Sequence, residues 1–290
     1  MASYIEQTAD YWIIKDDIGY GNALVLKTSW STPFLELVAR HNIKIIRLNE
    51  RVGWHDSDVS FLAEIPGIHG VDILSDNVTD VSSIFDLSEL KTLSLYCKAK
   101  AAGDFANLKK LQRVSLGWRG VYTSVFGLDY LVRINILGFP DKDLSRWKRN
   151  RWLKELLLES DNLESVAGAE RFPEVRWLDL SRCRVLSSLD AATSSTSIRK
   201  LSIKRCPRLR DLSPVSHLSE LRELEIADCC NILSLAPICQ CKKLGSLEIS
   251  GTTTVLDGDM SCLKTLPNLK RVLLVHKKHY SHTADELERK

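Results

Sequence analysis

Apolar residues recur along most of the chain in a hexamer whose first, fourth and sixth positions are Leu, Ile or Val. Two copies, Ile198–Ile203 and Leu221–Ile226, match position for position, and the match continues through the residues that follow each of them. The frame starts eleven times, at Ile43, Ile68, Leu90, Leu111, Leu131, Leu153, Val175, Ile198, Leu221, Leu244 and Leu269. Such near-constant spacing of one short frame predicts a stack of eleven structural repeats.

Each repeat predicts a strand followed by a tight return path. Positions four and six alternate with mostly polar residues, which is the period of a half-buried strand. Behind the strand, apolar residues recur at every third position, as from Val78 to Leu90. A period of three is that of the 3₁₀ helix. Since such a unit cannot bury its apolar side chains alone, we expect an α/β solenoid with a concave parallel β-sheet and a convex side of 3₁₀ turns, short helices and loops.

The two ends of the chain lie outside the frame. Two apolar runs, Tyr11–Ile14 and Ala23–Leu26, flank a glycine-rich turn and predict two strands, and Ser31–Pro33 predicts the start of a short helix. A capping-box pattern at Thr283 and Glu286 predicts a terminal helix. We interpret residues 1–42 as an N-terminal cap, with a separate binding role as the alternative, residues 43–275 as the solenoid, and residues 276–290 as a tail or capping helix.

The regularly spaced L-x-x-L-x-L frame resembles the leucine-rich repeat family, in its internalin-like form. That family takes Asn or Cys at position nine of the frame, where this chain has Cys183, Cys206 and Cys229. The resemblance implies that these three side chains point inward and bond backbone groups of the turn. Cys239 and Cys262 are also one repeat apart, on the convex arc.

The cysteines allow two interpretations. The closely spaced Cys229–Cys230 and Cys239–Cys241 could form a zinc site. Free cysteine more commonly packs as a small hydrophobe, and the matching repeat positions favour reduced, buried thiols without metal. His276, His279 and His282 have a metal-like spacing, but their charged tail supplies nothing to enclose an ion.

Composition and motifs exclude several function classes. The chain has 40 Lys and Arg against 37 Asp and Glu, a net charge of +3 without a basic stripe, so we expect no nucleic-acid partner. We expect no membrane partner, because no apolar run could cross a bilayer, and a cytoplasmic location, because Met1–Asp10 has no apolar core of an export signal. Gly-rich phosphate loops, H-E-x-x-H and G-x-S-x-G are missing. We therefore expect neither an enzyme nor a cofactor.

Frame positions two, three, five, seven and eight project from the sheet or its rim away from the core, so a large side chain there has no packing role. Aromatic residues and Arg at such positions are typical of protein interfaces. The candidate partner-binding residues are Tyr96, Arg113, Trp118, Arg133, Glu155, Glu159, Trp177, Asp179, Arg182, Lys200 and Lys204. A solvated sheet with scattered charge is the alternative for each of them. Trp177 is the expected anchor, and the acidic candidates would face a basic partner.

Two loops also carry aromatic residues that could bind a ligand. Trp54 and His55 follow the first frame, and the basic stretch Trp147–Trp152 could contact phosphates. We expect instead that Trp54 folds onto the sheet edge and that Trp147 takes an inward apolar place.

Together these features predict a non-catalytic protein-binding module. Small bacterial proteins of the leucine-rich repeat family include immunity proteins, so the resemblance implies a toxin inhibitor that occludes its partner, for example a basic toxin domain such as a nuclease. The alternative is a regulatory scaffold subunit similar to phosphatase-binding leucine-rich repeat proteins. An enzyme with an unrecognised site is a third hypothesis.

Overall fold

The computed structural model describes residues 3–15, 19–190 and 197–288. The chain divides into two compact units, Met1–Leu131 and Val132–Lys290. Each unit is described by itself.

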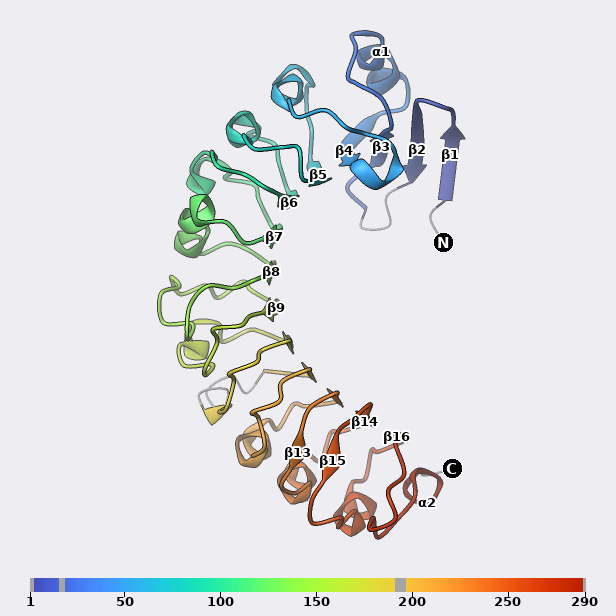
Figure 1. Ribbon diagram of the computed structural model, residues 1–290, viewed down its shortest axis with the longest axis vertical. Helices are drawn as coiled ribbons and strands as arrows, with labels where there is room; N and C mark the ends of the chain where they lie inside the picture. The colour runs from blue at the N-terminus through green and yellow to red at the C-terminus, as the bar shows by residue number, and fades with distance from the viewer. Residues whose placement is uncertain (1–2, 16–18, 191–196, 289–290) are drawn as a thin grey trace. The chain divides into compact units, whose positions relative to one another are not determined.

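The described part of the first unit contains one sheet of seven strands (Figure 1). They are β1 (Ser3–Gln7), β2 (Tyr11–Lys15), β3 (Asn22–Leu26), β4 (Ile43–Asn49), β5 (Gly70–Ser75), β6 (Thr92–Cys97) and β7 (Arg113–Gly117). The first three strands pair antiparallel, and all pairs from β3 to β7 are parallel. The two predicted N-terminal strands are confirmed as β2 and β3, whereas β1 was not predicted.

Helix α1 (Pro33–Arg40) begins after Thr32 with proline in its first turn, as predicted. The return paths of the first unit are the 3₁₀ helices η1 (Glu50–Val52), η2 (Ser60–Glu64), η3 (Ser82–Asp86), η4 (Phe105–Asn107) and η5 (Gly120–Gly127). Trp54 is fully buried, so this loop aromatic packs against the protein instead of facing solvent, while His55 is exposed.

The described part of the second unit contains a parallel sheet of seven strands. They are β8 (Arg133–Leu137), β9 (Glu155–Glu159), β10 (Trp177–Ser181), β11 (Lys200–Lys204), β12 (Glu223–Ala227), β14 (Ser246–Ser250) and β16 (Arg271–Leu274). Each pairs with the next in direct register. A second, two-stranded sheet joins β13 (Asn231–Ile232) to β15 (Thr254–Val255) in the return paths.

The remaining elements of the second unit are short helices. The 3₁₀ helices are η6 (Ala169–Arg171), η8 (Ser213–His217), η9 (Ala236–Gln240) and η10 (Ser261–Thr265), and the chain then forms α2 (Ala284–Leu287). The predicted capping box of α2 is confirmed, because the Thr283 backbone N–H donates to Glu286 Oε2 at 2.8 Å.

All eleven frames form strands, and their apolar positions build the core. Positions four and six are buried in every frame except the last, where Leu274 is only half-buried. Figure 1 shows the strands on one side of each unit and the 3₁₀ turns on the other. This is the predicted leucine-rich repeat architecture, because period-two strands and period-three turns share one core. We call the sheet face opposite that core, formed by positions three, five and seven, the open face.

Three cysteines at position nine point inward as predicted. Cys183, Cys206 and Cys229 are fully buried, and Cys206 Sγ lies 3.3 Å from the carbonyl oxygens of Leu180 and Lys204, either of which can accept its one hydrogen. The hydrogen bond with Cys183 raises the pKa of Cys206 to about 12. The Cys206 thiol therefore stays protonated at neutral pH and bonds the turn.

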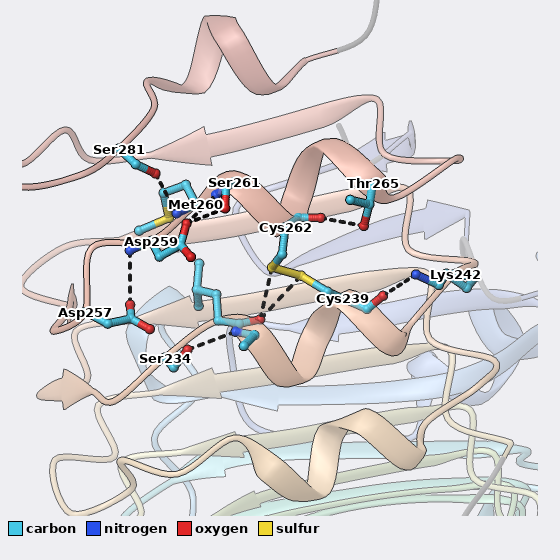
Figure 2. Close-up of a disulfide and its surroundings, with 12 residues drawn as sticks. Ser234, Cys239, Lys242, Asp257, Asp259, Met260, Ser261, Cys262, Thr265 and Ser281 are labelled. Carbon is cyan, nitrogen blue, oxygen red and sulfur yellow. Dashed lines mark hydrogen bonds between the residues drawn. A yellow bond between two sulfur atoms is a disulfide. The ribbon is translucent and has the colours of Figure 1, made fainter.

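The expectation of reduced thiols is wrong for Cys239 and Cys262, which form a disulfide between η9 and η10 (Figure 2). One repeat separates the two residues, so they occupy equivalent places on neighbouring turns. Their Cα atoms lie 5.9 Å apart, a separation that a disulfide spans. Cys230 is exposed. In the described part of the chain, no three His, Cys, Asp or Glu side chains are grouped so as to hold a metal.

Candidate partner-binding face

The open face of the second unit carries seven of the eleven candidate residues, and an eighth, Arg182, lies at its edge. One row crosses its strands at frame position three, where Arg133, Glu155, Trp177 and Lys200 are direct neighbours in register. The strand alternation that sends positions four and six into the core turns these side chains to the open face. The sequence frame thus predicted their neighbourhood.

Trp177 lies between two cations. The Arg133 guanidinium carbon is 5.4 Å from the centre of the indole, and Lys200 Nζ is 4.9 Å from it. The ring is half-buried, and its Nε1 is buried without a hydrogen-bond partner in the described structure. Each cation–π contact stabilises the ring position by about 0.5–1 kcal/mol when partly exposed. The indole is therefore held in place before any partner arrives.

Both cations beside the indole are themselves paired. Arg133 forms an ion pair with Glu155, and Lys200 Nζ lies 3.5 Å from Glu223 Oε2. Ion pairs of this exposure contribute roughly 0–1 kcal/mol each, so their main effect here is to fix geometry and to compensate charge.

Arg182 extends the candidate set to position eight, just beyond β10. Its φ of 51° is in the left-handed region, and Arg205 and Asp228 repeat this conformation at position eight of the next two frames. The turn directs the Arg182 side chain back to Glu159, with 3.3 Å between Nη1 and Oε1. Arg182 and Glu159 therefore compensate each other at the edge of the face.

Lys204 is surrounded by carboxylates. Its Nζ lies 2.8 Å from Glu225 Oε1. Burial disfavours the ammonium, yet the hydrogen bond and charge of Glu225, together with the charges of Asp179 and Glu248, raise the pKa of Lys204 above its ordinary value. The ammonium therefore stays charged at neutral pH, in a cluster of three carboxylates and one cation.

Two of those carboxylates have no ion pair within the described part of the chain. Asp179 accepts a hydrogen bond from Ser181 Oγ at 2.5 Å, and Glu248 accepts one from Ser250 Oγ at 2.9 Å. These hydroxyls orient the carboxylates without neutralising them. The charge that remains uncompensated at this cluster is therefore negative.

Two carboxylates of the cluster, Glu225 and Glu248, were not among the candidates, and neither was Ser202, which lies between Asp179 and Glu225 in register. All three share frame position five with Asp179. Ser202 is fully buried, and its hydroxyl has no partner in the described structure. The row register could have identified all three, because position five of consecutive strands is one line of neighbours.

The other three candidates, Tyr96, Arg113 and Trp118, belong to the first unit. Tyr96 and Arg113 lie half-buried on the open face of β6 and β7. The Trp118 ring stacks on Phe126 of η5, with 5.0 Å between centroids and 19° between planes. Trp118 therefore packs against the return path of its own repeat.

The basic stretch Trp147–Trp152 separates into an inner and an outer aromatic residue. Trp147 is buried between the rings of Phe139 and Phe172, as expected. Trp152 is 56% exposed, with the Arg151 guanidinium 6.0 Å from its ring centre.

No helix in the described residues combines the length and the apolar character that crossing a bilayer requires.

Comparison with known proteins shows the fold. No protein-family model matches the chain, and no curated protein matches it. An internalin, InlF from Listeria monocytogenes, superposes with a TM-score of 0.58 at 18% identity, over 91% of this chain and 84% of that chain. The functional domain of InlJ from the same organism, which includes a cysteine ladder, superposes with a TM-score of 0.50 at 16% identity, over 76% of this chain and 46% of that chain.

Proposed function

Because the chain has the leucine-rich repeat fold, we propose that it is a non-catalytic protein-binding module, and that it acts as an immunity protein which neutralises a toxin by occluding it. The observation that carries this proposal is the open face of the second unit. There the indole of Trp177 is fixed between two paired cations, beside a cluster with uncompensated negative charge.

The charge of the cluster indicates the kind of partner. Asp179 and Glu248 lack ion-pair partners in the described structure, whereas Arg133, Lys200 and Lys204 are each paired. A partner surface rich in Lys or Arg would supply the missing compensation and would associate faster through electrostatic attraction. A basic domain such as a nuclease, whose substrate is an anion, presents such a surface.

The indole supplies the apolar part of the contact. Tryptophan is enriched among the residues that dominate binding energy, especially when neighbouring side chains exclude water from it. Trp177 is held by Arg133 and Lys200 before binding, so a partner would lose little side-chain entropy in covering it. Occlusion then needs no chemical step by this chain.

The test compares two tryptophans. A protein that co-purifies from the native host is identified, and its affinity is measured by titration calorimetry against the parent, Trp177→Ala and Trp152→Ala. Trp152 is the matched control, because it is exposed on a return path and lies off the open face. Trp177→Ala should raise the Kd about thirtyfold, equivalent to about 2 kcal/mol, and Trp152→Ala should leave it unchanged.

Three outcomes would contradict the proposal. Equal affinity of the parent and Trp177→Ala would exclude the open face of the second unit as the site. A partner whose toxic activity persists in the complex would exclude neutralisation, and recovery of a phosphatase would favour a regulatory scaffold.

A further inference from the structure

The open face of the first unit contains a groove of about 420 Å³. Tyr4 of β1 and Trp12 of β2 line one side of it, and Leu74 of β5 and Tyr96 of β6 line the other. This volume lies within the range of ligand sites, which combine apolar and aromatic walls with a few polar groups. Of the candidate partner-binding residues, only Tyr96 is among those that line it.

The floor of the groove is a single row across four strands. Val25, Arg47, Asp72 and Ser94 are neighbours in register on β3, β4, β5 and β6. Arg47 and Asp72 carry opposite charges side by side, so the floor has no net charge. It therefore attracts neither cations nor anions strongly.

Asp72 is a half-buried hydrogen-bond acceptor on this floor. Burial raises the pKa of this carboxyl, although the Ser94 hydroxyl bonds to it and the charge of Arg47 opposes the rise. A half-buried carboxylate in this position gains from each further hydrogen-bond donor. A ligand that brings one donor to Asp72 is therefore favoured.

The walls fit a ring. Tyr4 and Trp12 meet edge to face, with 5.9 Å between ring centroids, and Tyr4 is 49% exposed. The floor next to them continues into a buried apolar cluster that includes Ile14 and Val25. Aromatic surfaces of this kind pair favourably with a further aromatic side chain.

A cationic side chain fits less well. Lys27 Nζ already lies 5.2 Å from the Trp12 ring centre, so this aromatic wall has a cation of its own. An incoming ammonium would have to approach this Lys27 ammonium.

We propose that this groove binds a tyrosine or tryptophan side chain of a protein partner, with the ring between Tyr4, Trp12 and Tyr96 and its O–H or N–H donated to Asp72. The inference rests on the proposed protein-binding function, but it concerns the first unit, which the Trp177 test does not touch.

The test uses the full chain and three capped tripeptides, acetyl-Gly-Tyr-Gly-amide, acetyl-Gly-Phe-Gly-amide and acetyl-Gly-Lys-Gly-amide. Binding is followed by NMR on the indole N–H of Trp12, assigned with Trp12→Phe. The tyrosine peptide should shift this resonance saturably and bind about tenfold more tightly than the phenylalanine peptide, because it adds one hydrogen bond to a charged acceptor.

Two matched variants isolate the role of Asp72. Asp72→Asn keeps the shape but removes the charge, so the tyrosine-to-phenylalanine ratio should fall to about threefold, since a neutral hydrogen bond is about half as strong. Asp76, four residues after Asp72, is the control position, because its exposed carboxylate forms an ion pair with Lys98. Asp76→Asn should leave the tyrosine-to-phenylalanine ratio unchanged. If Asp72→Asn only disturbed the groove, both peptides would bind more weakly by the same factor and their ratio would stay at about tenfold. That result would count against a hydrogen bond from the tyrosine to Asp72.

Two results would overturn the inference. One is the absence of a saturable shift with the tyrosine peptide, and the other is tighter binding of the lysine peptide, which would assign the groove to a cation. If the peptides fail while Trp177→Ala still weakens the partner complex, the proposed function stands and the groove has no aromatic ligand.

Discussion

Replacing Leu224 by Asp would test the stacked core at one position of the frame. Leu224 is 2% exposed, and its neighbours in register are Leu201 and Leu247. Loss of the buried leucine costs about 2–3 kcal/mol. Keeping the new carboxyl neutral at pH 7, about three pH units above its ordinary pKa of ~3.9, costs about 4 kcal/mol more.

The sum of about 6 kcal/mol is comparable with the whole stability of many domains. Urea unfolding followed by circular dichroism should therefore show loss of structure or a much lower midpoint. The carboxyl has its pKa raised in the folded state, so stability falls as pH rises above its unfolded-state pKa. The difference between variant and parent should accordingly be smaller at pH 4 than at pH 7.

Leu233→Asp is the matched control, because Leu233 is 47% exposed next to β13. The same exchange there should change the midpoint little. An unchanged midpoint for Leu224→Asp would refute the assignment of position four to the core, and an equal loss for both variants would refute the argument from burial.

Two further predictions concern charge and covalent structure. Asp179→Asn combined with Glu248→Gln should slow association with a basic partner and flatten its salt dependence in stopped-flow measurements; an unchanged rate would place the electrostatic contact elsewhere. Cys239→Ser combined with Cys262→Ser should lower the free energy of unfolding by about 3 kcal/mol in urea titrations. The parent in a strong reductant should be as stable as this double variant. Equal stability of the oxidised parent and the double variant would contradict a structural role for the disulfide.

The repeat frame predicted most of the fold because the spacing of apolar residues within each repeat determines its strand and its return path. Strand alternation alone places a position-four residue such as Leu224 in the core and a position-three residue such as Trp177 on the open face. The sequence therefore distinguishes core residues from open-face residues. Strand β1 escaped prediction because Ser3–Gln7 is mostly exposed and has no apolar alternation.

For the candidate site, the sequence could predict which residues are neighbours in a row across the strands, but not how their side chains contact one another. Register places Arg133 two strands from Trp177, but the side-chain torsions that bring its guanidinium to 5.4 Å from the indole follow from packing across strands. The groove around Asp72 needs β1, whose pairing with β2 joins residues without a repeat pattern. The disulfide was not predicted because the repeat period alone does not show which side chains of neighbouring turns face each other.

The disulfide also sets a boundary for how the chain loses order from its C-terminal end. Stacked repeats behave as a one-dimensional array in which terminal units fray first. Cys239 belongs to the ninth frame and Cys262 to the tenth, so the last frame and α2 can detach while the tenth stays tethered to its neighbour. Since the bond lies in the return paths, the tether persists even where strand pairing opens, and re-stacking then begins from turns already held together.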